Sequence, residues 1–453
     1  MSAIRVAKAA IKIPKRIERG PTDILKALAS TVKHVPTEPD QLLQDDPYLL
    51  PIRPSQRNLF ALSRLSGKNA AKFILNKHPE LFVRDDSEPK VRTFLPPEEY
   101  RDDMEFNEDD LKWCIDNNDA VNGAIAYNNL VSKKVKLSDE VILQFFELLC
   151  YTNEEKMLDQ LEIERQYVLR DSERQLVDQT WKNTGLVSKI FNQIKGEMDP
   201  TRVYSAMIAG LSKFNEHATA KQIFEDFKEF HPDSPLCAEA YDGLLNSVPN
   251  LHSSVETAHQ AVEDIVQHME GHSVMPTVRV FNSILNTYKR FFCDDETIKR
   301  SLSLLNDMHK LGITPSLFTY SSLFTILAKN RGNKYNREVI GDLLDYIHHN
   351  DDIIYELKDE RDLEFLVTSM RIFSNQLYNL NYANKLHKIY LKKPTLFSHV
   401  ASKGGYFNNY FRLIVTSGRL DNIIHFYNNY APMNFRPSDD NYEALQEVLD
   451  LYR

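Results

Sequence analysis

Hydrophobic positions recur along most of the chain at the spacing of amphipathic helices. Long stretches rich in Leu, Ala, Glu and Lys favour helices, whereas the alternating Val and Ile runs that predict strands are scarce. A single core rarely exceeds about 250–300 residues, so a chain of 453 residues needs several domains or a repeat array. We therefore expect an all-α protein built from more than one structural unit.

Two stretches with the same layout indicate a repeat. One runs from Tyr406 through the Gly418–Asp421 segment to Pro437, and the other contains Gly312 and Pro315. Glycine can end a helix in the left-handed conformation, and proline cannot continue a helix. This layout predicts pairs of helices. A single pair cannot bury its own apolar stripes, so neighbouring pairs must stack and share a continuous core.

The repeats can be counted from an aromatic residue at position 4, in the first helix, to position 35 after the turn proline. This register gives 35 residues for the repeat 404–438 and 39 for 278–316. Further repeats are predicted at 105–139, 201–237, 238–277 and 364–403, and others begin at 140 and 317. About eight repeats therefore precede a partial ninth repeat.

Two charged insertions and an incomplete end interrupt this array. One insertion, near 153–184, splits the second repeat and is expected to be a solvated helix or loop. The other lies around Asn350–Asp362. The last repeat begins at Asp439 and has one helix before Arg453, which would expose an apolar face. We expect a partner there, or a natural chain that continues.

Residues 1–104 lack the repeat spacing and contain many prolines. Short helices are predicted at 22–32 and 55–76, and the remainder is predicted to be an extended arm of the kind that wraps around partners. The first 20 residues carry six basic side chains against one acidic side chain. That pattern is typical of a mitochondrial presequence or its remnant, and also of an ordinary basic tail.

Four segments of the arm follow one another in a distinctive order. They are Ile13–Thr22, Ala27–Thr31, Asp45–Leu49 and Ala70–Ile74. Together with the degenerate repeats, they resemble the family of pentatricopeptide-repeat (PPR) proteins of the mitochondrial ribosomal small subunit. The resemblance covers nearly the whole chain. It implies a right-handed α-solenoid of degenerate helix-turn-helix repeats over 105–453, preceded by an extended N-terminal arm.

The resemblance also implies a function and a location. It predicts a structural protein of the mitochondrial ribosome, in the mitochondrial matrix. The expected partners are the small-subunit rRNA, mRNA and other mitochondrial small-subunit ribosomal proteins. The protein would help to recruit mRNA near the entrance of the mRNA channel.

PPR arrays bind single-stranded RNA with one base per repeat, contacted by two or three side chains. In the family, these side chains stand at positions 5 and 35, which we call the base-reading positions. The residues at position 5 are Asp109, Gln144, Ser205, Asp242, Asn282, Ser321, Thr368, Asn408 and Glu443. The residues at position 35 are Asp139, Thr277, Ser316 and Ser438.

Two combinations resemble a base-reading pair, Asn282 with Ser316 and Asn408 with Ser438. Ser321 is a further polar candidate at position 5. The alternative is that these side chains face solvent or a ribosomal neighbour. Because so few positions fit, we expect loose, sequence-tolerant contact with RNA instead of base-specific recognition.

The net charge of −9 opposes a general RNA-binding surface. RNA contact must then be local, or the chain must act within a larger assembly. In the arm, Lys12, Lys15, Arg16 and Arg19 are expected to neutralise rRNA phosphates. The alternative is a solvated charged tail.

No catalytic, metal or cofactor site is predicted. The four cysteines lack zinc-ligand spacing, and no phosphate-binding or nucleophile-elbow motif occurs. His268 and His272 are four residues apart, but Met269 stands where the zinc-peptidase motif requires glutamate. We expect a protein that is not an enzyme and takes no small-molecule substrate. No apolar run is long enough to span a membrane.

Two other functions remain open. A free mitochondrial PPR factor for RNA stability or processing would have the same repeats, but it needs no long arm. A helical scaffold for protein interactions is disfavoured by the Gly-x-x-Pro turn and by repeats longer than 34 residues.

Overall fold

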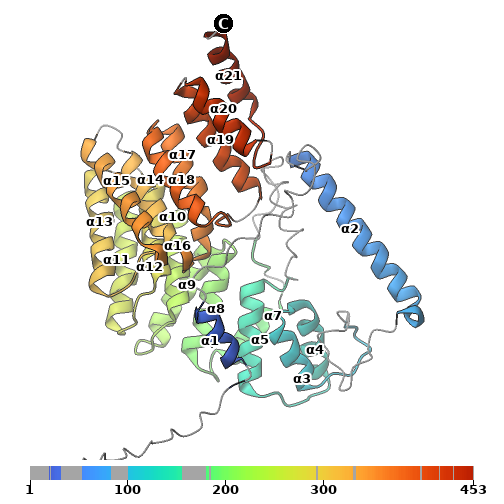
Figure 1. Ribbon diagram of the computed structural model, residues 1–453. Coiled ribbons are helices and arrows are strands. Elements are labelled where there is room, and N and C mark those ends of the chain that lie inside the picture. The colour runs from blue at the N-terminus through green and yellow to red at the C-terminus, as the bar shows by residue number, and fades with distance from the viewer. Residues whose placement is uncertain are drawn as a thin grey trace, which may run out of the picture. The chain divides into compact units, whose positions relative to one another are not determined.

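The computed structural model describes most of the chain, in twelve segments. They are residue 20, residues 22–31, residue 51, and residues 54–82, 100–155, 180–182, 185–291, 294–329, 333–397, 400–417, 419–431 and 433–451. Within these segments every regular element is a helix (Figure 1), which confirms the all-α prediction. The chain divides into two compact units, 1–45 and 46–453, which are described separately.

The described part of the first unit contains α1 (Asp23–Thr31). The second unit begins with α2 (Pro54–Lys77) and the short 3-10 helix η2 (Pro79–Leu81). Both α1 and α2 lie in stretches for which the sequence predicts helices. The insertion predicted near 153–184 falls almost entirely outside the described residues.

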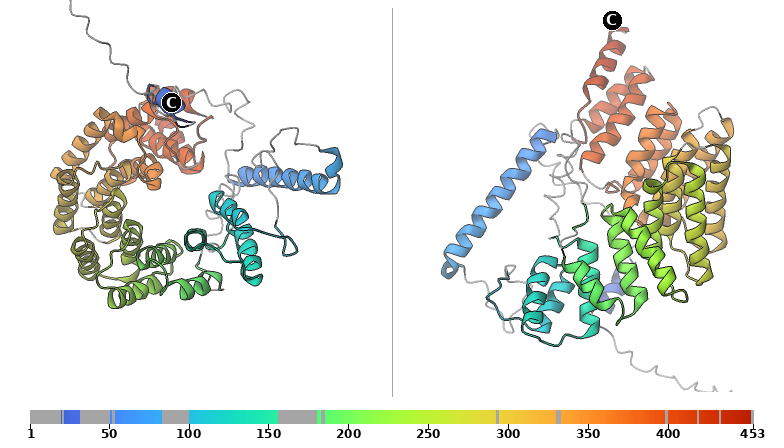
Figure 2. Two further views of the ribbon diagram at one scale, coloured as in Figure 1. Left: turned by 90° about the horizontal axis from the view of Figure 1, so that it is seen from below. Right: turned by 180° about the vertical axis from the view of Figure 1, so that it is seen from behind.

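From residue 108 onward, helices follow one another as antiparallel pairs. The pairs are α3 (Glu108–Asp116) with α4 (Ala120–Ser132), α5 (Asp139–Thr152) with α7 (Leu186–Ile194), α8 (Pro200–Lys213) with α9 (His217–Phe230), α10 (Ala238–Leu251) with α11 (Val255–Gly271), α12 (Val278–Arg290) with α13 (Asp295–Lys310), α14 (Leu317–Lys329) with α15 (Lys334–His349), α17 (Phe365–Asn375) with α18 (Leu380–Lys392), and α19 (Val400–Thr416) with α20 (Leu420–Tyr430). In the described chain, α21 (Asp439–Leu451) follows the last pair. Each first helix packs against the first helix of the next pair (Figure 2), so these helices form a continuous row from α3 to α21.

The turns within and between pairs use the residue types that tight helix ends require. Asn118 and Asn215 adopt positive φ between the helices of their pairs, and Gly312 adopts φ +70° after α13. Second helices often begin at a side-chain cap, as when Asp119 accepts from the backbone N–H of Asn122 at the start of α4. These local signals explain why the chain breaks into pairs at regular intervals.

The core lies between successive pairs and contains most of the aromatic side chains at position 4. Tyr241, Tyr320 and Phe407 each have less than 2% of their surface exposed. Close packing of the row also demands small residues. A Cβ added at Gly210 in α8 would lie 2.6 Å from the backbone oxygen of Cys150 in α5, so the two helices touch through their backbones there.

A charged insertion separates the α14–α15 pair from α17. It consists of α16 (Asp351–Tyr355) and a segment of residues 356–364 that ends in the 3-10 helix η4 (Glu360–Glu364). We call residues 356–364 the inserted segment. It packs against α14 and α17, both in the row of first helices. The insertion therefore brings charged side chains to the positions predicted to contact RNA.

Candidate RNA interface

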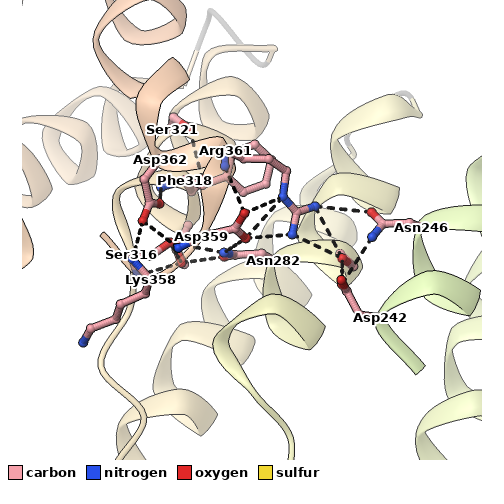
Figure 3. A network of polar contacts seen from close by, with 12 residues as sticks. Asp242, Asn246, Asn282, Ser316, Phe318, Ser321, Lys358, Asp359, Arg361 and Asp362 are labelled. Atoms are coloured by element: carbon pink, nitrogen blue, oxygen red, sulfur yellow. Dashed lines mark hydrogen bonds and ion pairs between the residues drawn. The ribbon is translucent and has the colours of Figure 1, made fainter. Parts of the chain in front are cut away.

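The first predicted base-reading pair, Asn282 and Ser316, is in direct contact and buried. The amide of Asn282 donates to Ser316 Oγ at 3.1 Å and to Asp359 Oδ2 at 2.8 Å, and its Oδ1 accepts from Thr319 Oγ1 at 2.6 Å. Asn282 is 0% exposed and Ser316 1% exposed. The inserted segment therefore supplies an acceptor, Asp359, to the side chain at the predicted base-reading position 5 (Figure 3).

The inserted segment is anchored by a second carboxylate. Asp362 Oδ1 accepts from the backbone N–H of Phe318 at 2.7 Å, in the first turn of α14. Its Oδ2 accepts from the backbone N–H groups of Lys358 and Asp359, both at 3.0 Å. Negative charge at a helix N-terminus satisfies unpaired N–H groups and complements the helix dipole. Asp362 thus fixes the inserted segment to the start of α14.

Arg361 extends the network to the preceding repeat. Its guanidinium forms a bidentate pair with Asp359, with Nη2 2.7 Å from Oδ2 and Nε 2.9 Å from Oδ1. Its Nη1 also donates to Asn246 Oδ1 at 3.3 Å and lies 3.4 Å from Ser283 Oγ. Ser283 in turn donates to Asp242, which stands at position 5 of its own repeat. One connected network therefore spans position 5 of two successive repeats, in α10 and α12.

The electrostatics of the network favour a charged pair at its centre. Burial raises the pKa of Asp359, but hydrogen bonds and positive charge from Arg361, with a hydrogen bond from Asn282, outweigh burial and lower the pKa overall. Burial also raises the pKa of Asp242, and the hydrogen bond from Ser283 and the charge of Arg361 offset this only in part. Asp359 is therefore the ionised partner of Arg361.

A ring in α14 contacts two cations of this site. The guanidinium carbon of Arg361 lies 4.6 Å from the centre of the Phe318 ring, and Lys289 Nζ lies 4.7 Å from it. Burial lowers the pKa of Lys289 to about 8, opposed by Glu364 and reinforced by neighbouring positive charges, including that of Arg361. The site thus holds positive charge next to an aromatic face.

Two further position-5 candidates, Asn408 and Ser321, also bond within the protein. Asn408 donates to the backbone oxygens of Gly404 and Arg436 at 3.0 and 3.1 Å, and its Oδ1 accepts from the backbone N–H of Ser438 at 2.9 Å. The Ser438 side chain is exposed. Ser321 is 3% exposed and donates to the backbone oxygen of Phe318 at 3.0 Å. Ser438 is the exposed residue among the five array residues singled out as RNA contacts, which are Asn282, Ser316, Ser321, Asn408 and Ser438.

An open pocket lies next to the network. It has a volume of about 430 Å³ and is lined by Asp242, Thr277, Arg279 and Lys358, among others. Asp242 and Thr277 occupy positions 5 and 35 of the repeat 238–277. The pocket therefore leaves the base-reading positions of that repeat accessible from solvent, with two basic side chains at its edge.

The arm candidates Lys12, Lys15, Arg16 and Arg19 lie outside the described residues. Helix α2, within the arm as predicted, carries five basic residues and no acidic residue over its 24 residues. At helical spacing, Arg64, Lys68 and Lys72 share one face, and all three are exposed. The opposite face carries exposed apolar side chains, including Leu59 at 63% and Phe73 at 65% exposure. Helix α2 is thus basic on one side and apolar on the other.

The two histidines four residues apart are engaged in protein hydrogen bonds. His268 Nδ1 lies 2.9 Å from the Tyr241 hydroxyl, and the two nitrogens of His272 lie within 3.0 Å of the backbone oxygens of His268 and Pro232. In the segments that the structure describes, no group of three or more His, Cys, Asp or Glu side chains is arranged to hold a metal ion. Across those same segments, no helix combines the length and apolar character that a bilayer crossing requires.

Sequence reasoning missed Asp359, Arg361 and Phe318 as members of this site. The available signal was the charged insertion around Asn350–Asp362, which breaks the repeat between two helix pairs. An insertion rich in charge is most often solvated, and nothing in its composition indicates the partners it contacts.

Comparisons with known proteins agree with this architecture. Residues 22–216 match a family model described as "Small ribosomal subunit protein mS39, PPR". The chain is 26% identical to "Small ribosomal subunit protein mS39" of Drosophila melanogaster, covering 98% of this chain and 67% of that protein. It is 25% identical to the protein of the same name from Xenopus laevis, covering 97% of this chain and 67% of that protein. The chain thus spans about two thirds of the length of these relatives.

Among solved structures, the chain matches that of the pentatricopeptide repeat protein PPR10 from maize. It is 12% identical, with a TM-score of 0.40 over 76% of this chain and 41% of that chain. Neither the matched family nor the PPR fold is a class of enzyme. The family model across the arm and first repeats, and the relatives across nearly the whole chain, support a relationship of this chain to the mS39 family of small ribosomal subunit proteins.

Proposed function

We propose that this chain is a structural component of the small subunit of the mitochondrial ribosome, in the mitochondrial matrix. The observation that carries the proposal is the similarity to mS39 proteins over 97–98% of the chain, the arm included. The narrower equivalence with pentatricopeptide repeat domain-containing protein 3 is part of this proposal. Other small-subunit ribosomal proteins would be its protein partners.

The arm is the part proposed to contact rRNA. Lys12, Lys15, Arg16 and Arg19 would neutralise phosphates, and the basic face of α2 would do the same. The opposite, apolar face of α2 would then pack on a neighbouring ribosomal protein, since an exposed apolar stripe of this kind marks an interaction surface. A helix that is basic on one side and apolar on the other suits an assembly that contains both RNA and protein.

The array is proposed to help recruit mRNA near the channel entrance by loose contact. Ser438, exposed in the turn between α20 and α21, and the pocket beside Asp242 offer polar groups to a passing strand. The side chains of Asn408 and Ser321 already bond to backbone oxygens, so these residues would contribute by fixing the backbone around them. Asn282 and Ser316 could contact a base only after Asp359 moves away.

Sedimentation of mitochondrial lysate tests the proposal. The tagged protein is run on a sucrose gradient with and without RNase, and with and without magnesium chelation. Migration with the small subunit and the full ribosome supports a ribosomal component. Migration near the top, or in light particles that RNase dissolves, would contradict it and favour the free RNA-binding factor.

A further inference from the structure

The inserted segment places charged side chains at base-reading positions of the array's middle repeats. Asp359 bonds to Asn282 at position 5, and Arg361 bonds to the Ser283–Asp242 pair around position 5 of the preceding repeat. Ser316, at position 35, is held in the same network. An RNA base that bound to Asn282 or Ser283 would therefore have to displace Asp359 or Arg361.

The segment is held there by more than one kind of contact. Asp362 bonds to the first turn of α14, Arg361 stacks on Phe318, and the Asp359–Arg361 pair is almost completely removed from solvent on the Asp359 side, with 1% side-chain exposure. Every hydrogen-bonding group of the Asn282 amide is satisfied by protein. Buried polar groups that are already satisfied gain little by exchanging partners.

We propose that Asp359 and Arg361 are specificity-determining residues, which keep the Asn282–Ser316 pair closed to RNA bases. The inference rests on the proposed RNA contact of the array and explains how a PPR-type array can bind RNA without base preference at its centre. The adjacent repeat keeps its open pocket beside Asp242 and Thr277, so the closure acts on one base position and leaves the neighbouring surface accessible.

The test compares base selectivity instead of affinity alone. The full chain is incubated with a pool of single-stranded RNA oligonucleotides of random sequence, and bound RNA is recovered and sequenced. The opening variant is Asp359→Ala with Arg361→Ala, which removes both charges of the pair together. The matched control is Lys334→Ala with Glu338→Ala, which removes an exposed ion pair in α15. Like the opening variant, it leaves the net charge unchanged.

The expected result is that wild type and control show no base preference, whereas the opening variant acquires a preference of about three- to tenfold at one nucleotide position. That preference should disappear when Asn282→Ala is added to the opening variant. If the alanine pair prevents folding, as judged by circular dichroism, Asp359→Ala with Arg361→Met serves in its place, because it removes both charges and keeps an unbranched side chain beside Phe318.

Three outcomes contradict the inference. A wild-type preference that Asn282→Ala abolishes would mean that the pair is already open. A folded opening variant that binds RNA without new selectivity would mean that the segment is not the barrier. Absence of RNA binding by every variant would overturn the proposed RNA contact itself, and the closure with it. Filter binding of the same RNA pool to each variant measures affinity and separates this case from the other two.

Discussion

At the scale of single residues, the Asp359 carboxylate binds two partners at the centre of the network, Asn282 and Arg361. It accepts from Asn282 and pairs with Arg361, and its side chain is 1% exposed. Asp359→Ala leaves a partly buried guanidinium and a buried amide without their acceptor. We expect it to lower the free energy of unfolding at pH 7 by about 3–5 kcal/mol, measured by urea denaturation.

The matched control for this change is an ion pair at the surface. Asp345→Ala removes the partner of Lys385, and both side chains of that pair are more than a third exposed. A decrease of about 0–1 kcal/mol is expected there. Equal decreases for the two variants would show that the buried pair contributes no more to stability than the pair at the surface.

His387 gives a pH-dependent prediction at the same scale. Its nitrogens lie 3.1 and 2.8 Å from the hydroxyls of Tyr406 and Tyr430, and burial lowers its pKa from 6.5 to about 4. The unfolded chain therefore takes up the proton first as the pH falls. Stability from this residue is complete above pH 6.5 and declines between pH 6.5 and 4, by up to about 3 kcal/mol.

Thermal denaturation across this pH range, compared with His387→Phe, measures that decline. The variant should be less stable at pH 7, because two tyrosine hydroxyls lose a partner, but its stability should fall less steeply below pH 6.5. Changing the exposed His309 to Phe should leave the slope unchanged. An identical slope in all three proteins would rule out His387 as the source.

At the scale of helices, replacing either of two glycines inside helices by alanine should change the stability of the fold, in opposite directions for the two positions. A Cβ at Gly210 would lie 2.6 Å from the Cys150 backbone oxygen, whereas a Cβ at Gly341 would meet only the Tyr382 ring at 3.6 Å. Gly210→Ala should destabilise by about 1–3 kcal/mol through overpacking. Gly341→Ala should stabilise by about 0.5–1 kcal/mol, since alanine favours the helix.

Urea denaturation of the two alanine variants measures both changes. If Gly210→Ala were as stable as wild type, the backbone contact between α5 and α8 would be looser than described. If Gly341→Ala were destabilising, a neighbour other than Tyr382 would have to contact the new methyl group.

The helices themselves follow from local signals, and the site does not. Turn residues such as Gly312 and Pro315, and caps such as Asp119, are visible in the chain, so the all-α fold class could be predicted and is confirmed. The numbering of the repeats also predicts that Asn282 and Ser316 form a pair, and their side chains are in contact. The position of Asp359 could not be predicted, because it depends on how residues distant in sequence pack around a charged insertion.

At the scale of the whole molecule, the net charge of −9 makes the basic face of α2 the main described candidate for RNA phosphate contact. Changing Arg64, Lys68 and Lys72 together to alanine should weaken binding to ribosomal RNA. It should also reduce the slope of log affinity against log salt by about 0.7–0.9 for each phosphate that is no longer neutralised. Filter binding at several salt concentrations measures both effects.

Three exposed lysines of α13 and α15, Lys299, Lys310 and Lys334, provide the control. Their replacement by alanine removes the same charge at a distance from the arm in sequence and should leave the salt slope nearly unchanged. A slope reduced equally by both triple variants would point to general charge attraction and would contradict a specific role for α2.

The inserted segment also affects how the array of repeats unfolds. In a solenoid each repeat touches only its neighbours, so opening can start anywhere and spread one repeat at a time. Here Arg361 donates to Asn246, 115 positions earlier, and Asp359 accepts from Asn282, 77 positions earlier. These cross-links tie α10, α12 and α14 to one short segment. We expect the middle repeats to exchange their amide hydrogens as a single cooperative block, while the flanking repeats fray independently.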